Sequence, residues 1–177
     1  DSRIAEEVTG STLGIVGLGR IGSAVARRAC GFDLRVLYTK RTRVETDLGE
    51  FRELDALLVE AELVTLHVPL TPGTRGRFGA AELARMKRGA ILVNTARGPI
   101  VDEAALVAAL RAGTIAHAGL DVFDKEPLPR DHPLTQLENV TLTPHLGYVA
   151  EEIYRKFYEG DVERLRWHFI PNEMFPR

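Results

Sequence analysis

Short apolar runs alternate along this chain with segments in which apolar residues recur at helical spacing. The apolar runs are bounded by Gly, Pro and polar residues, a pattern typical of strands buried in a parallel sheet. They predict strands at residues 13–16, 34–38, 63–68, 90–94, 115–122 and 140–142. The helical spacing predicts helices over residues 21–29, 51–61, 80–87, 102–113 and 147 to about 169. Asp102 is expected to cap the fourth helix, and Gly160 weakens the prediction of the last one.

Strands that alternate with helices at this spacing predict an α/β fold. We expect a Rossmann-type, doubly wound parallel sheet with three αβα layers, whose ligand lies beyond the carboxyl ends of the strands. The dinucleotide-binding domain is predicted to cover residues 13–169. Residues 1–12 are interpreted as the end of an incoming segment, and residues 170–177 as a tail.

A glycine-rich stretch follows the first predicted strand. Gly17, Gly19 and Gly22 form a G-x-G-x-x-G pattern that encloses Arg20 and Ile21. The first Gly permits a tight turn, the second lets the backbone approach a pyrophosphate, and the third allows close packing of helix on strand. Because the pattern lies between a strand and a helix, we interpret it as a dinucleotide site on a helix N-terminus.

The composition of the chain argues against several classes of function. The chain has 177 residues and a formal net charge of −2, which gives no electrostatic case for nucleic-acid binding. Its apolar runs are too short to cross a membrane, and no metal site is expected from a single cysteine. That residue, Cys30, is expected to be small and buried on the first helix. Because the chain opens at Asp1 without an apolar signal region, a cytoplasmic setting is expected.

The end of the second predicted strand bears on the choice of cofactor. An NAD site usually places a carboxylate about 20 residues beyond the glycine motif, where it binds the ribose hydroxyls. Thr39, Lys40 and Arg41 occupy this region, and Arg43 follows. These cations suit the 2′-phosphate of NADP, which a carboxylate would repel. NADP is therefore favoured over NAD, with a solvated basic turn as the alternative.

Five motifs in order make the sequence resemble the D-isomer-specific 2-hydroxyacid dehydrogenase family. They stand at residues 13–22, 67–72, 93–98, 119–127 and 143–147, and the resemblance covers residues 10 to about 165. A Tyr-x-x-x-Lys motif typical of short-chain reductases does not occur, and one cysteine argues against a zinc alcohol dehydrogenase. Several ordered motifs are far more specific than the glycine pattern alone.

The resemblance implies hydride transfer between a nicotinamide cofactor and a small 2-oxo or D-2-hydroxy acid. Arg97 would bind the carboxylate and keto oxygen, His145 would exchange the proton, and Glu126 would pair with His145. Asp121 would hold the nicotinamide carboxamide. The cofactor cleft would be lined by Gly19, Arg20, Ile21, Pro69, Thr74, Thr95 and Ala96. A homodimer is expected from the same resemblance.

The sequence departs from the family pattern because the residues that build most of the substrate domain are missing. We therefore expect the chain to bind cofactor and to turn over poorly, since one wall of the cleft would be open to water. The alternative function is a dinucleotide-sensing interaction module, as in corepressors related to the family. Among the other histidines, His67 is expected to line the cleft wall. His117, His132 and His168 are expected to be structural or exposed.

Overall fold

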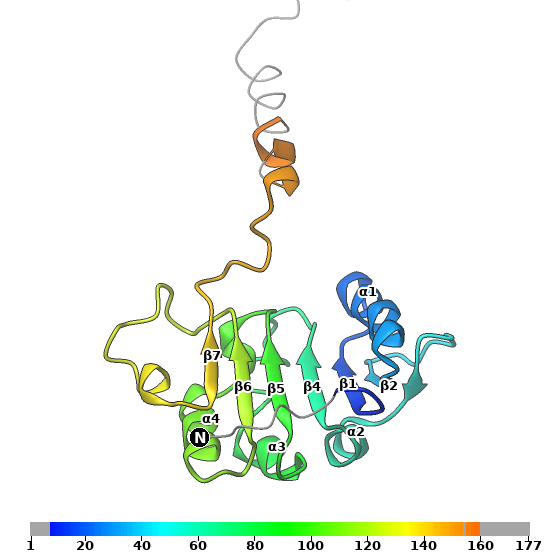
Figure 1. The fold of residues 1–177 in the computed structure, drawn as a ribbon, viewed down its shortest axis with the longest axis horizontal. Coiled ribbons are helices and arrows are strands. Elements are labelled where there is room, and N and C mark those ends of the chain that lie inside the picture. Colours follow the sequence, from blue (N-terminus) through cyan, green and yellow to red (C-terminus); the bar gives the residue numbers. More distant parts are fainter. Residues whose placement is uncertain (1–7, 154, 160–177) are drawn as a thin grey trace, which may run out of the picture. The chain divides into compact units, whose positions relative to one another are not determined.

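Seven parallel strands form a single sheet in the order β3-β2-β1-β4-β5-β6-β7 (Figure 1). The computed structural model describes residues 8–153 and 155–159. The strand order reverses between β1 and β4, and this switch point is where doubly wound sheets bind their ligands. The strands are β1 (Thr12–Val16), β2 (Arg35–Thr39), β3 (Glu50–Phe51), β4 (Leu63–Leu66), β5 (Ile91–Asn94), β6 (His117–Leu120) and β7 (Val140–Leu142).

Helices flank the sheet on both faces, which confirms the predicted Rossmann-type fold. The α-helices are α1 (Arg20–Ala29), α2 (Leu54–Glu60), α3 (Ala80–Arg85) and α4 (Glu103–Arg111). Three short 3-10 helices, which the hydrophobic pattern did not predict, cover Cys30–Phe32, Gly98–Ile100 and Pro133–Gln136. The side chain of Asp102 accepts a hydrogen bond from the Ala105 N–H, as expected of the cap of α4.

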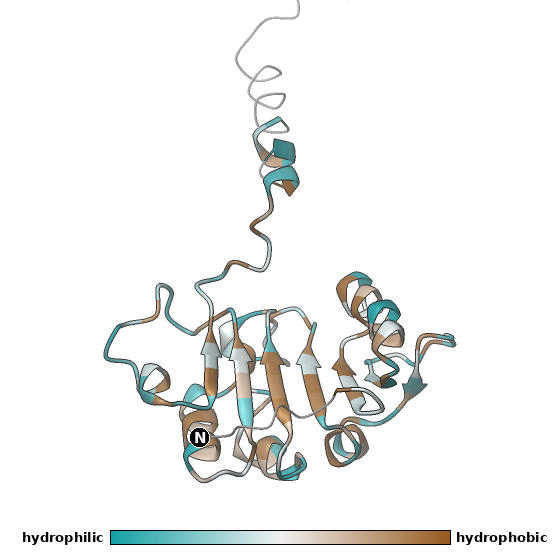
Figure 2. Ribbon diagram, in the orientation of Figure 1, coloured by the Kyte–Doolittle hydropathy of each residue, from teal (hydrophilic) through white to brown (hydrophobic). Residues whose placement is uncertain are grey.

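Two hydrophobic clusters hold the layers together, one on each face of the sheet. Ile15 of β1 packs with Ala26 of α1, whereas its neighbour Val16 belongs to the cluster that contains Leu57 of α2. This separation follows from the alternation of side chains along a strand. Strands β4 and β5, in the middle of the sheet, are hydrophobic over most of their length (Figure 2). Burial on both faces explains why β1 reads as a nearly continuous apolar run.

The sheet contains one strand that the hydrophobic pattern did not predict. Phe51 lies in the edge strand β3, so the predicted start of the second helix at residue 51 is wrong and α2 begins at Leu54. The Phe51 ring packs edge-on against Tyr38 of β2, with 5.7 Å between centroids. Four charged side chains, Arg35, Glu50, Arg52 and Glu60, form ion pairs beside this edge. A short, charged edge strand of this kind resists pairing with other chains.

Cys30 does not lie where it was expected. It belongs to the 3-10 helix that follows α1, and its side chain is exposed instead of buried. The thiol donates a hydrogen bond to the carbonyl of Ala26. The buried positions of α1 are Gly22, Ala26 and Ala29, and the chain leaves the sheet surface directly after them.

The chain divides into two compact units, residues 1–144 and residues 145–177. In the second unit, residues 151–153 and 155–159 are helical, while residues 147–150 form no helix. The predicted helix over 147–169 therefore begins later than expected. Its last part, residues 160–169, and the predicted tail, residues 170–177, lie outside the described residues. No helix in the described part of the chain is both long and apolar enough to span a membrane.

Candidate functional site

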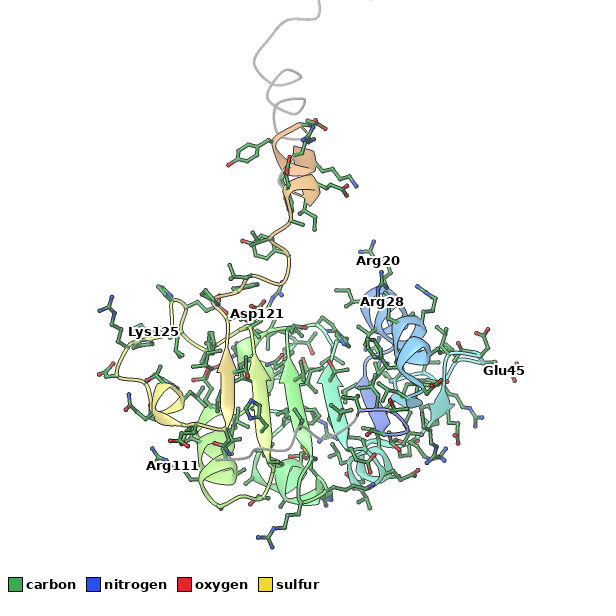
Figure 3. The ribbon with its side chains drawn as sticks, viewed as in Figure 1. Arg20, Arg28, Glu45, Arg111, Asp121 and Lys125 are labelled. Carbon is green, nitrogen blue, oxygen red and sulfur yellow. The ribbon has the colours of Figure 1, made fainter. Side chains whose placement is uncertain are left out.

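The residues predicted to bind the cofactor gather at one edge of the sheet, where the strands end. Gly17 follows β1, Thr39 ends β2, Pro69 lies beyond β4, Thr95 follows β5 and Asp121 follows β6. Figure 3 shows Arg20 at the start of α1 and Asp121 at the end of β6, both on this edge. Parallel strands bring their carboxyl ends together, so residues far apart in sequence share one surface.

Each glycine of the turn after β1 has a distinct spatial role. Gly17 has a φ of +102°, and a Cβ on it would lie 2.7 Å from the carbonyl oxygen of His67. A Cβ on Gly22 would lie 2.2 Å from the carbonyl oxygen of Gly17. A Cβ on Gly19 would meet no atom of the protein within 4 Å. Gly17 and Gly22 are thus required by the turn itself, and the space over Gly19 is open to a ligand.

The start of α1 offers hydrogen-bond donors to an anion. Gly19 is the N-cap residue and has no side chain with which to cap the helix. The first turn contains no acidic residue, and it begins with the exposed side chains of Arg20 and Ile21. The first N–H groups of a helix lack partners within the helix, and they carry the positive end of its dipole. The donors and the open space over Gly19 therefore fit the pyrophosphate of a dinucleotide.

A basic loop follows Thr39 at the end of β2. Thr39 contributes to the turn through its carbonyl oxygen, which accepts a hydrogen bond of 3.0 Å from the N–H of Gly17. Lys40 and Arg41 are exposed, and neither forms an ion pair with any carboxylate among the described residues. The Arg43 guanidinium lies over the Phe51 ring, 5.6 Å from its centroid. Two cations, Lys40 and Arg41, therefore remain available to a ligand phosphate.

Arg97 stands in a loop that a buried side chain organises. Asn94 is 1% exposed at the end of β5. Its Nδ2 donates to the carbonyl of Arg97 across 3.0 Å, and its Oδ1 accepts from the N–H of Ala96 across 3.1 Å. The Arg97 side chain is exposed, and its Nη1 donates to the carbonyl of Ala96. The loop backbone is fixed while the guanidinium stays at the surface, as an anion-binding arginine requires.

The Arg97 loop touches the segment that carries Glu126. A Cβ on Gly98 would lie 2.0 Å from the carbonyl carbon of Phe123, so the two backbones are in direct contact. The N–H of Phe123 in turn donates to Glu126 Oε1 across 3.0 Å. Two of the three predicted catalytic residues, Arg97 and Glu126, are therefore carried by loops that pack on each other.

Asp121 is a buried carboxylate at the same edge of the sheet. It is 5% exposed, and its Oδ1 accepts a hydrogen bond of 2.6 Å from the hydroxyl of Thr143. The N–H of Thr143 donates to the carbonyl of Leu120, which ties the end of β7 to the end of β6. Buried carboxylates are retained when hydrogen bonds stabilise them, so Thr143 accounts for part of the environment of Asp121.

The segment from Pro69 to Thr74 forms a compact loop beyond β4. The Thr74 hydroxyl donates to the carbonyl of Pro69 across 2.6 Å and accepts from the N–H of Thr71 across 2.8 Å. Pro69 and Thr95 are exposed, whereas Thr74 and Ala96 are half-buried. These loops flank the strand ends, and the part that Pro69, Thr74, Thr95 and Ala96 play in cofactor binding stays a prediction.

His145 is the first residue of the second unit. Its backbone has a φ of +56°, a left-handed conformation that is uncommon for residues other than glycine. Its ring packs edge-on against Tyr148, with 5.5 Å between centroids. Within this unit the backbone and an aromatic neighbour define the imidazole position. The predicted pairing of His145 with Glu126 joins residues of two different units and stays a prediction.

The other histidines have different surroundings, and the expectation that His67 lines the cleft wall stays a prediction. His67 is half-buried after β4, and burial lowers the pKa of its imidazole below the ordinary value. Its Nε2 lies 3.1 Å from the Thr65 hydroxyl. His117 contacts the hydroxyl of Thr141, and His132 pairs with Glu103. His168 lies outside the described residues. No group of His, Cys, Asp and Glu residues in the described part of the chain is arranged to hold a metal ion.

This arrangement of strands, glycine turn and strand-end residues has known counterparts. Residues 1–147 match the model of the D-isomer specific 2-hydroxyacid dehydrogenase, NAD binding domain. The chain belongs to this family. The family that the five motifs predicted is thus confirmed, and with it the expectation of a domain that binds a nicotinamide dinucleotide. That the glycine turn holds this dinucleotide stays a prediction.

Similar proteins agree with this assignment. A glyoxylate reductase of Korarchaeum cryptofilum is 53% identical over 163 residues, which are 90% of this chain and 49% of that protein. The TT0316 protein of Thermus thermophilus superposes with a TM-score of 0.87 at 49% identity, covering 92% of this chain and 51% of that one. The structure of D-lactate dehydrogenase with NAD+ from Lactobacillus jensenii superposes with a TM-score of 0.85 at 34% identity. The match covers 92% of this chain and 54% of that one. The chain spans about half the length of the relatives it matches.

Three residues near the site, Asn94, Gly98 and Thr143, were not predicted to have a role. Asn94 organises the Arg97 loop, Gly98 permits its contact with Phe123, and Thr143 donates to Asp121. A polar residue at the end of an apolar strand was a usable signal for Asn94. No local pattern could reveal the other two, because their partners are more than twenty residues away in the sequence.

Proposed function

We propose that this chain is the cofactor domain of a reductase that transfers hydride from NADPH to a small 2-oxo acid of the glyoxylate or hydroxypyruvate kind. The observation that carries the proposal is the contact between the Arg97 loop and the Glu126 segment, at the sheet edge that also holds the open glycine turn. The similarity to a glyoxylate reductase over nearly the whole chain supports the substrate class.

Arg97, Glu126 and His145 are proposed to act on the substrate. A bound dihydronicotinamide supplies the hydride. The exposed Arg97 guanidinium binds the substrate carboxylate and stabilises the charge that gathers on the keto oxygen. His145 donates the proton to that oxygen, and Glu126 pairs with His145 and orients it. Asp121, held by Thr143, binds the carboxamide of the nicotinamide ring. In the reverse direction His145 is the base.

The preference for NADP is proposed to reside in Lys40 and Arg41. Both are exposed and free of carboxylate partners in the described region, and the two-residue strand β3 directs its Glu50 to Arg35 and Arg52. The 2′-phosphate of NADP would therefore meet two cations that pair with no carboxylate among the described residues. A homodimer is proposed on the family resemblance, and a cytoplasmic setting is proposed as the default.

Isothermal titration of the 177-residue chain with NADP and with NAD tests the cofactor preference. We expect tighter binding of NADP, and a loss of most of this discrimination in Arg41→Asp. Arg88→Asp is the matched control, because Arg88 is exposed in the turn between α3 and β5, at the amino ends of the strands. If Arg41→Asp and the unaltered chain distinguished NADP from NAD equally well, the proposal that the basic loop binds the 2′-phosphate would be refuted.

Single-turnover assays at high chain concentration, with glyoxylate and hydroxypyruvate, test the reaction. We expect slow oxidation of NADPH by the chain, and none by Arg97→Ala, with dinucleotide binding retained in both. Removal of a group that stabilises developing charge typically costs about 10²–10³ in rate. No oxidation in either protein would favour the dinucleotide-sensing alternative, and rapid multiple turnover would refute the expectation that the chain alone is a poor catalyst.

A further inference from the structure

One carboxylate, that of Glu103, connects the two ends of the segment that carries Glu126. Glu103 Oε1 accepts a hydrogen bond of 2.7 Å from the N–H of Asp124. Its Oε2 lies 3.3 Å from Nε2 of His132. We define the stretch between these contacts, residues 124–132, as the Glu126 loop. Its two ends are thus bound to the same side chain at the start of α4.

The carboxylate is not needed to cap the helix on which it stands. Glu103 is the first residue of α4, and the capping hydrogen bond to the N–H of Ala105 comes from Asp102. Both Glu103 oxygens face the Glu126 loop instead. The side chain is half-buried, at 18% exposure, so its contacts are only partly screened by water.

His132 is oriented to receive this contact. Its Nδ1 accepts a hydrogen bond of 3.3 Å from the N–H of Leu134, which leaves the Nε2 hydrogen to point at Glu103. The N–H of His132 donates to the carbonyl of Pro129, and the Thr135 hydroxyl donates to the carbonyls of Arg130 and His132. The far end of the Glu126 loop is therefore a hydrogen-bonded turn that includes His132.

A surface pocket lies beside the two ends of the Glu126 loop and the start of α4. It is lined by residues that include Pro99, Val101, Asp102, Glu103, Asp124 and His132. Asp124 and His132, the two loop residues that line this pocket, are the two that contact Glu103. The apolar contact of Leu128 with the core fixes the middle of the loop, and Lys125 points into solvent (Figure 3).

We propose that Glu103 is a positioning residue, which holds the Glu126 loop so that the Glu126 carboxylate stays against the Phe123 N–H and beside the Arg97 loop. The inference rests on the proposed function, because it gives Glu126 its part in the reaction. Glu103 does not touch substrate or cofactor. It acts through Asp124, which directly follows the residue that binds Glu126.

Nuclear magnetic resonance of the 177-residue chain tests the proposal without requiring turnover. The Phe123 amide donates to Glu126, so its chemical shift should follow the ionisation of that carboxylate across a pH titration. Glu126→Gln should abolish this response. In Glu103→Ala we expect the response to fall by about half or more, and exchange of the Phe123 and Asp124 amide hydrogens to quicken by about tenfold.

Two further variants separate positioning from a loss of stability. Glu103→Gln retains an oxygen for the Asp124 N–H and loses the charge opposite His132, so an intermediate effect is expected. Glu82→Ala is the matched control. Glu82 also lies in the first turn of a helix and also binds a backbone N–H, that of Gly79, but it is remote from the Glu126 loop. Glu82→Ala should leave the Phe123 response unchanged.

The inference would be overturned if Glu103→Ala changed neither the pH response of the Phe123 amide shift nor the exchange of the Phe123 and Asp124 amides. It would also be overturned if Glu126→Gln showed the same pH response of the Phe123 amide as the unaltered chain. Failure of the proposed function gives a different result. If Glu126→Gln leaves single-turnover oxidation of NADPH intact while Glu103→Ala still alters the Phe123 amide, Glu103 positions the loop and Glu126 has no part in the reaction.

Discussion

The hydroxyl of Thr143 donates a hydrogen bond of 2.6 Å to the buried carboxylate of Asp121, and thereby joins the ends of β7 and β6. The two residues lie beyond neighbouring strands, at the edge where a Rossmann sheet binds its ligand. This bond provides the buried Asp121 carboxyl group with a hydrogen-bond donor inside the protein. It also fixes the end of β7, from which the chain continues to Pro144 and His145.

Thr143→Val should therefore destabilise the chain and weaken its binding of dinucleotide. Valine retains the shape of threonine but cannot donate, and removal of one partner of a buried polar group typically costs about 1–3 kcal/mol. Urea unfolding and calorimetric titration measure the two effects. Thr114→Val is the control, since the Thr114 hydroxyl has no hydrogen bond among the described residues. Equal stability of the two variants would contradict the importance of the Asp121 contact.

Gly98→Ala should displace the Arg97 loop. The added methyl group would lie 2.0 Å from the carbonyl carbon of Phe123 and 2.2 Å from its oxygen, and a change of rotamer cannot relieve contact with backbone. Overpacking of this kind typically costs about 1–3 kcal/mol. Thermal unfolding of Gly98→Ala and Gly73→Ala provides the comparison, because a Cβ on Gly73 meets nothing within 4 Å. A melting temperature unchanged by Gly98→Ala would show that the two loops are not in contact.

The two glycines Gly19 and Gly22 should respond differently to the same substitution. Gly22→Ala places a methyl group 2.2 Å from the carbonyl oxygen of Gly17 and should lower the stability of the fold. Gly19→Ala meets only open space, so stability should be retained while dinucleotide affinity falls by about tenfold or more, a loss of about 1.4 kcal/mol. Circular dichroism and calorimetric titration test this contrast. Undiminished affinity in Gly19→Ala would place the pyrophosphate elsewhere.

His67 should make the chain less stable at mildly acidic pH. Burial lowers the pKa of the folded imidazole, so below its ordinary value of about 6.5 the unfolded chain binds a proton that the folded chain does not. The contribution of His67 to stability is therefore complete above that pH and declines as the pH falls toward the pKa of the folded state. Urea unfolding between about pH 7.5 and 5.5 should show a smaller decline for His67→Gln than for the unaltered chain. An imidazole that titrates in the folded chain at or above its ordinary pKa would exclude this mechanism.

The sequence predicted the fold class, six of the seven strands and the family. The glycine turn was recognisable because its strand, turn and helix are contiguous, and the Arg97, Asp121 and His145 motifs were recognisable by their order. The sequence did not reveal β3, since Phe51 also fits an apolar helical pattern and only its packing on Tyr38 places it in the sheet. Cys30 was misplaced because helical spacing does not show where a helix leaves the surface it covers.

The sequence by itself determined six of the seven strands, the glycine turn between β1 and α1, and the family to which the chain belongs. These properties depend on residues that are neighbours in the chain, through apolar periodicity and the steric freedom of glycine. Only the tertiary structure decided that Gly98 contacts Phe123, that the Thr143 hydroxyl donates to Asp121, and that Glu103 contacts both ends of the Glu126 loop. Those contacts join residues distant in sequence, and their distances exist only once the sheet has brought the strand ends together.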